Sequence, residues 1–198
     1  QSAVDIATQT IDCIHTTAAS HNRVFIVEIM GHKVGWLPLH AGVAGGADII
    51  LIPEIPYDIN KVIGAINKRT KAGKGFTILA VAEGAISKED SSLTKKAYKA
   101  KVADRKYPSV SYEIADQIYE AAGVEVRVTV PGHTQRGGSP CPYDRVLCTR
   151  LGSAAAQAII EEDYGCMIAM INGETKRVPL AEVSGKLKTV DPDCQMIQ

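Results

Sequence analysis

The sequence predicts an α/β fold with a largely parallel sheet and helices on both of its faces. Short apolar runs alternate with stretches of helical periodicity along most of the chain. The apolar runs are nearly continuous, which is typical of strands that helices cover on both sides. Most of the predicted strands end at a glycine with polar or ionisable residues beside it. Together these features indicate a Rossmann-like arrangement, in which ligands bind beyond the carboxyl ends of the strands.

The first third of the chain gives two strands and two helices. A first strand is predicted over residues 24–30, a short apolar helix over 35–44, and a second buried strand over 48–52. An opening helix precedes them, because apolar residues recur at helical spacing at Val4, Ala7, Ile11 and Ile14.

The middle of the chain begins with a helix that Asp58 can cap and Gly73 can end. A third buried strand follows over residues 76–82. Residues 87–106 are rich in lysine and poor in large apolar side chains, which favours a solvated lid, helix or insertion.

The last third starts with a helix from Ser109 to Gly123. Over residues 124–130, valines alternate with charged or polar residues, which predicts a half-exposed strand. A hairpin turning at Asn172-Gly173 closes the chain. Before it, residues 143–162 predict a long helix whose apolar stripe is Leu147, Leu151, Ala155 and Ile159.

Composition excludes several classes of protein. The 198 residues carry 22 lysines and arginines against 22 aspartates and glutamates, which argues against a nucleic-acid binder or a polybasic membrane-surface protein. No run approaches the ~20 apolar residues that a membrane span requires. Five scattered cysteines without C-x-x-C spacing favour a reducing, cytoplasmic location. Because the chain begins at Gln1 and enters a helix directly, we expect a piece of a longer protein.

The segment 131–140, P-G-H-T-Q-R-G-G-S-P, is the most informative. It places His133 and Arg136 on a glycine-rich loop after a strand. Arginine binds phosphate bidentately and exposed backbone N–H groups add donors, so the loop suits a phosphate. A surface turn with an incidental arginine is an equally good interpretation of its composition.

Two further strand ends carry candidate residues. Met30-Gly31-His32-Lys33 lies between a strand and a helix start, which is a natural place for an anion. Glu83 follows an apolar strand, where a carboxylate needs a partner. It could accept hydrogen bonds from sugar hydroxyls, or it could pair with a lysine or arginine. Glu54, between two prolines, favours a structural turn.

Arg23 and Arg127 do not fit a single crevice. Arg23 precedes its strand and so lies at the opposite edge of the sheet from Met30, and Arg127 lies partway along its strand, away from the valines. Neither reaches the crevice of His133 easily. They are either solvated surface charges or they serve a neighbouring subunit.

Two segments carry a family resemblance. They are residues 27–58, V-E-I-M-G-H-K-V-G-W … A-G-G-A-D-I-I-L-I-P-E-I-P-Y-D, and residues 132–145, G-H-T-Q-R-G-G-S-P-C-P-Y-D-R. Both resemble the 6-phosphofructokinase family. The likeness covers nearly the whole chain and corresponds to the carboxyl-terminal half or so of the family's catalytic chain. It implies a phosphofructokinase-type sugar-phosphate domain over residues 1–141, with residues 142–198 belonging to an incomplete donor-side domain.

The resemblance implies a role for each candidate. Fructose 6-phosphate would be bound within one subunit by Met30, Gly31, Glu83, His133 and Arg136. Arg23 and Arg127 match arginines that a neighbouring subunit of a homo-oligomer, a dimer or tetramer, contributes to the 6-phosphate. His32 stands where many members have an arginine that assists the transferring phosphoryl group.

The resemblance also shows what is missing. The family's G-G-D donor loop and its T-I-D-x-D segment with the aspartate base do not occur in this sequence. ATP or pyrophosphate and its Mg²⁺ would bind mainly outside the chain. Phosphoryl transfer needs positioning and charge stabilisation together, so we expect this chain to bind the sugar phosphate without turning it over. The alternatives are a non-catalytic sugar-phosphate-binding regulatory subunit and an unrelated sugar-phosphate isomerase or phosphatase.

Overall fold

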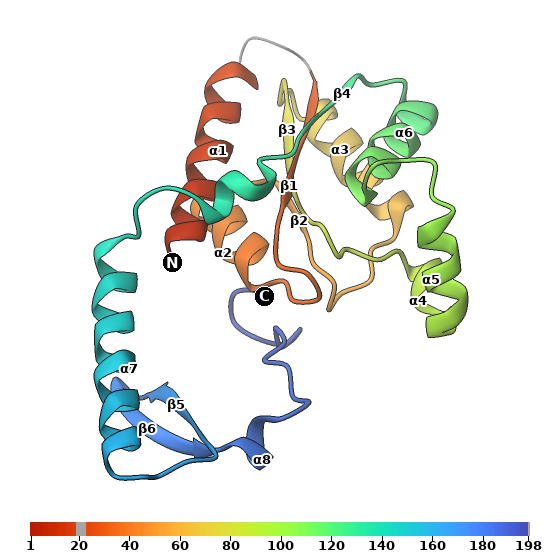
Figure 1. Cartoon of the computed structure of the whole chain (residues 1–198). Helices are drawn as coiled ribbons and strands as arrows, with labels where there is room; N and C mark the ends of the chain where they lie inside the picture. The colour runs from red at the N-terminus through yellow and green to blue at the C-terminus, as the bar shows by residue number, and fades with distance from the viewer. Residues whose placement is uncertain (19–22, 198) are drawn as a thin grey trace. The chain divides into compact units, whose positions relative to one another are not determined.

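The computed structural model describes residues 1–18 and 23–197 (Figure 1). It divides into two compact units, each considered separately. The larger comprises Ala3–Gly137 with Thr189–Gln198, and the smaller comprises Gln1–Ser2 with Gly138–Lys188. The division therefore falls a few residues before the expected boundary at residue 141, and the last ten residues belong to the larger unit.

The larger unit is built on one parallel sheet. Its strands are β1 (Val24–Ile29), β2 (Ile49–Leu51), β3 (Thr77–Ala82) and β4 (Val126–Thr129), in the order β2-β3-β1-β4. All pairings are parallel, which confirms the predicted sheet. The central strands β1 and β3 are buried at every residue. The edge strand β2 is only half-buried at two of its three residues, so its prediction as fully buried was wrong.

Helices cover both faces of this sheet, as predicted (Figure 1). On one face lie α1 (Ser2–Ala18) and α2 (Trp36–Ala44), and on the other α3 (Ile59–Lys71) and α6 (Val110–Ala122). Alternate residues of each strand point to opposite faces, so one apolar run supplies two cores. The first core contains Ile11, Ala41, Val27 and Ala80, and the second contains Ile66, Ile114, Ile26 and Leu79.

The helix ends lie where local chemistry predicts them. The side chain of Asp58 accepts a hydrogen bond from the N–H of Asn60 at 3.0 Å and caps α3. Gly123 ends α6 in the left-handed conformation with φ 64°, which glycine adopts without steric cost.

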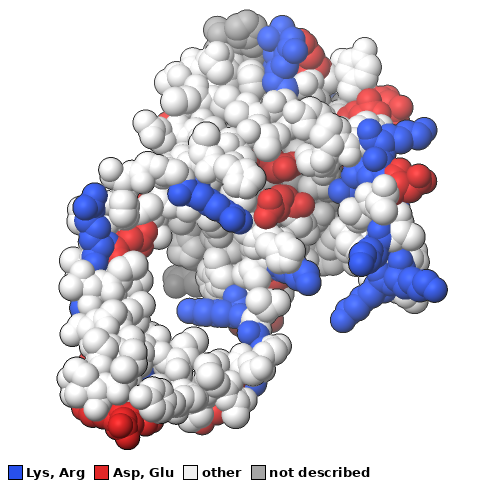
Figure 2. Space-filling model, viewed as in Figure 1, with Lys and Arg blue, Asp and Glu red and all other residues white. Residues whose placement is uncertain are grey.

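The lysine-rich segment forms two short helices, α4 (Lys88–Ser91) and α5 (Lys95–Ala103). Helix α5 buries no residue. It is held by the ion pair of Lys101 with the buried Asp90 at 2.5 Å. Figure 2 shows lysine and arginine side chains gathered over this end of the unit. The expectation of a solvated segment is confirmed.

The smaller unit contains α7 (Pro142–Ile160), the hairpin β5 (Cys166–Ile171) and β6 (Glu174–Pro179), and α8 (Leu180–Val183). Asn172 and Gly173 both have positive φ, 52° and 80°, which is the type I′ turn expected for a two-residue hairpin loop. The apolar stripe predicted for α7 was wrong at one position. Ile159 is 61% exposed, and Ala158 is buried instead.

Within the described residues, no helix is both long and apolar enough to cross a membrane.

Candidate functional site

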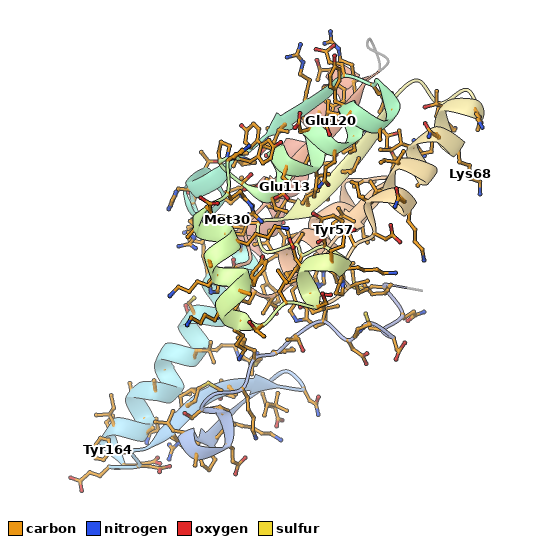
Figure 3. All side chains as sticks on the ribbon, turned by 90° about the vertical axis from the view of Figure 1, so that its right-hand side faces the viewer. Met30, Tyr57, Lys68, Glu113, Glu120 and Tyr164 are labelled. Carbon is orange, nitrogen blue, oxygen red and sulfur yellow. The ribbon has the colours of Figure 1, made fainter. Side chains whose placement is uncertain are left out.

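The carboxyl ends of three adjacent strands bring the predicted segments together in the larger unit. Met30, labelled in Figure 3, directly follows the central strand β1. Glu83 follows its neighbour β3, and the short 3₁₀ helix η1 (Gly132–Arg136) follows β4 on the other side. Because β1, β3 and β4 are parallel, their carboxyl ends share one edge of the sheet, which is where ligands of such folds bind.

Glu83 holds the turn after β1. Its Oε1 atom accepts hydrogen bonds from the N–H groups of Gly31, at 3.2 Å, and His32, at 2.7 Å. Among the described residues it forms no ion pair and its Oε2 atom has no hydrogen-bond partner, so the alternative of a lysine or arginine partner is not supported. One carboxylate oxygen fixes the backbone, and the other remains available to a ligand.

Two glycines allow the loops to approach this closely. A Cβ atom at Gly84 would lie 2.0 Å from the carbonyl oxygen of His32, and one at Gly31 would lie 2.5 Å from that of Val34. Real Cβ atoms do not approach backbone atoms so closely. The turn after β1 therefore rests directly on the loop after β3.

The backbone N–H that begins α2 is already occupied by a carboxylate. Both carboxylate oxygens of Glu54 lie 3.0 Å from the N–H of Gly35, the residue that caps α2. Glu54 also accepts the N–H of Val190 at 3.0 Å, so it has the structural role that its prolines favour. Glu83 and Glu54 thus take up the N–H groups of Gly31, His32 and Gly35, so an anion at this turn would depend on side chains.

The cationic residues gather on η1 instead. In a 3₁₀ helix, side chains three positions apart lie above one another, so His133 and Arg136 share one side of η1. Both are exposed, and neither has a hydrogen bond or ion pair with any described residue. The first part of the glycine-rich loop is thus a defined helical turn.

Gln135, between them, is the residue that sequence reasoning missed. Its side chain is only 1% exposed. The Oε1 atom accepts the N–H of Met30 at 3.2 Å, and the Nε2 atom donates to the carbonyl of Gly132 at 3.2 Å. The sequence showed only that the loop contains an amide, because the burial of Gln135 depends on β1, about a hundred residues away.

Arg23 and Arg127 lie elsewhere. Arg23 precedes β1, and Arg127 pairs with Phe25 near its start, so both lie toward the amino edge of the sheet. A strand advances about 3.3 Å per residue, which separates Arg23 from Met30 by roughly 20 Å. The carboxylate of Glu125 holds both arginines, with 2.6 Å to Nε of Arg23.

A cavity of about 650 Å³ lies beside Glu83 and His32. Tyr98 and Arg105, from the lysine-rich segment, line it as well. Arg105 is neutralised by Glu113 at 3.0 Å. The hydrogen bond from Lys101 to Asp90 raises the pKa of that lysine, which keeps the anchor of α5 charged.

Two titratable side chains, Tyr57 and Glu28, are buried near α5. Burial, and then the nearby carboxylate of Glu113, raises the pKa of Tyr57 well above its ordinary value (Figure 3). Glu28, at the end of β1, is buried and accepts a hydrogen bond from the hydroxyl of Ser109. The carboxylate of Glu28 therefore has a structural partner in Ser109.

The crevice does not fit a magnesium cage. Within residues 1–18 and 23–197, no three histidine, cysteine, aspartate or glutamate side chains lie together as metal ligands. One oxygen of Glu83 already accepts two backbone N–H groups. Mg²⁺ needs several oxygen ligands, so these residues alone would not hold it.

The comparisons with known proteins identify the family. The family model for phosphofructokinase matches residues 1–159. The ATP-dependent 6-phosphofructokinase of Spirochaeta thermophila is 54% identical over 196 residues, which cover 99% of this chain and 54% of that protein. The pyrophosphate–fructose 6-phosphate 1-phosphotransferase of Amycolatopsis methanolica is 43% identical over 96% of this chain and 56% of its own.

Solved structures show the same fold. Phosphofructokinase from Saccharomyces cerevisiae superposes with a TM-score of 0.75 at 33% identity, over 91% of this chain and 23% of that one. The T-state enzyme of Pichia pastoris gives 0.71 at 37% identity, over 91% and 19%. The chain spans about half the length of the curated relatives it matches.

Proposed function

The chain belongs to the phosphofructokinase family, and we propose that it carries the sugar-phosphate site of a 6-phosphofructokinase. The reaction transfers a phosphoryl group to the 1-hydroxyl of fructose 6-phosphate. The observation that carries the proposal is the pair of unpartnered cations on η1 beside a turn that Glu83 holds.

In this proposal the two sides of the crevice bind different parts of the substrate. Arg136 and His133 bind the phosphate, because they lie together on η1 and neither has a protein partner among the described residues. The sugar lies against Met30 and Gly31, and its hydroxyls donate to the second oxygen of Glu83. On the other side, Glu54 and Glu83 already occupy the backbone N–H groups of the turn, which supports this orientation of the 6-phosphate.

Arg23 and Arg127 act, in the same proposal, on the phosphate in a neighbouring copy of a homo-oligomer, a dimer or tetramer. Their distance from Met30 along β1 keeps them out of their own crevice. Glu125 holds them side by side, so that both guanidiniums can face one phosphate, and its carboxylate offsets one of their two charges. Two guanidiniums bind a phosphate dianion more strongly than one.

His32 is the proposed catalytic contact to the transferring phosphoryl group. It is exposed, has φ 55°, and its N–H is fixed by Glu83. Imidazole offers fewer N–H donors than a guanidinium, so it stabilises transition-state charge less.

The phosphoryl donor and its Mg²⁺ are proposed to bind mainly to residues outside this chain. Relatives are named for both ATP and pyrophosphate, so the donor is one of these two. The purified 198-residue chain is expected to bind fructose 6-phosphate and to give no turnover with either donor. A coupled assay that detects fructose 1,6-bisphosphate checks this, and clear turnover would contradict it.

Titration calorimetry with fructose 6-phosphate tests the site itself. A charge-assisted hydrogen bond contributes roughly 1.5–3 kcal/mol, so Arg136→Ala should weaken binding about tenfold or more. Arg150→Ala is the matched control, because this exposed arginine lies in the smaller unit. An unchanged affinity in Arg136→Ala, or an equal loss in both variants, would count against the assignment.

A further inference from the structure

We propose that Gln135 is a positioning residue, which orients η1 so that His133 and Arg136 face the sugar phosphate. The inference rests on the proposed function and adds a residue that touches no substrate. Gln135 acts through the two cations beside it and through the turn after β1.

The hydrogen-bond ladder between the parallel strands β1 and β4 ends before it reaches the N–H of Met30. The N–H of Val24 donates to the carbonyl of Glu125 at 3.1 Å, and the strands stay in that register up to Val27 and Thr129. Because the ladder repeats every two residues, the N–H of Met30 would fall opposite the carbonyl of Pro131. That carbonyl instead accepts the N–H and the hydroxyl of Thr134, at 3.2 and 2.7 Å.

Gln135 supplies the acceptor that the ladder lacks. Its Oε1 atom takes the N–H of Met30, and its Nε2 atom binds back to the carbonyl of Gly132, the first residue of η1. The amide accepts through one atom and donates through another, whereas an ionised carboxylate cannot donate and an apolar side chain does neither. One side chain thus joins β1 to the start of η1.

This anchor also sets the rotation of η1. The short helix buries Gln135 and exposes the residues on either side of it. Because the oxygen and the nitrogen of the Gln135 amide are both hydrogen-bonded, His133 and Arg136 are held together on the outward side of η1. Without it, the turn can rotate and the two cations no longer converge on one phosphate.

The test is Gln135→Met, which keeps the length of the side chain and removes both hydrogen bonds. Gln117→Met within α6 is the matched control, because the Oε1 atom of Gln117 is buried without a hydrogen bond among the described residues. Leaving a buried donor unpaired weakens the bound arrangement, so fructose 6-phosphate affinity should fall about tenfold in Gln135→Met and stay unchanged in the control.

Amide hydrogen exchange gives a readout that needs no ligand. The N–H of Met30 should exchange faster in Gln135→Met, while the amides of β3 stay protected as in the wild type. If this variant fails to fold, Gln135→Asn replaces it, since the shorter amide cannot reach both partners and should also weaken binding. Wild-type affinity in a folded Gln135 variant, or unchanged exchange at Met30, would overturn the inference. Absence of binding by the wild type would overturn the proposed function, and exchange at Met30 would still decide whether Gln135 holds the turn.

Discussion

Gly84→Ala is expected to damage the site by moving backbone. The added Cβ atom would lie 2.0 Å from the carbonyl oxygen of His32, and real Cβ atoms stay about 3 Å or more from such atoms. The obstacle is a backbone atom, so it cannot rotate away. The His32 carbonyl, or the loop after β3, must move by about 1 Å.

That displacement affects both the loop after β3 and the turn after β1. Glu83 precedes Gly84 and fixes the N–H groups of Gly31 and His32, so these contacts shift with the loop. Overpacking of this kind costs about 1–3 kcal/mol of unfolding free energy. A charge-assisted hydrogen bond to Glu83 contributes roughly 1.5–3 kcal/mol, so its loss should weaken fructose 6-phosphate affinity about tenfold or more.

Titration calorimetry and urea unfolding measure the two effects. Gly64→Ala is the matched control, because this exposed glycine lies within α3 and a Cβ atom there would meet nothing within 4 Å. Alanine is favoured over glycine in a helix by about 0.5–1 kcal/mol, so the control should be slightly more stable and bind normally. Wild-type affinity and stability in Gly84→Ala would refute the close contact on which the site depends.

Three further predictions concern stability. Hydrogen bonds from the hydroxyl and N–H of Ser2 lower the pKa of Asp144 from 3.8 to about 2. The ionised carboxylate therefore stabilises the folded chain above pH ~4, and this contribution disappears as the pH falls toward 2. Asp144→Asn should lower the unfolding midpoint at pH 6 and have no effect at pH 2, and an equal effect at both would contradict the shift. Asp58→Ala removes the cap of α3 and should cost about 1 kcal/mol in urea unfolding; an unchanged midpoint would argue against the cap. Ile114→Ala should cost about 2–5 kcal/mol, because its side chain is fully buried, and a loss below 1 kcal/mol would mean that the core beneath α6 can collapse.

The sequence by itself determined the elements of this protein. The apolar runs, the cap at Asp58 and the turn at Asn172-Gly173 depend on neighbouring residues, and periodicity records them directly. Parallel strands also placed His133 and Glu83 at one edge of the sheet. The loop motif also identified Arg136, because the glycines, the histidine and the arginine of the motif lie within a few positions of one another.

Only the tertiary structure decided how those residues are held. Glu83 fixes a turn about fifty positions earlier, and Gln135 fixes Met30 across about a hundred. Glu54 occupies the N–H of Gly35 that a sequence reading would leave to an anion. Each of these partners is distant along the chain and is brought near by strand order and register, which no local pattern encodes.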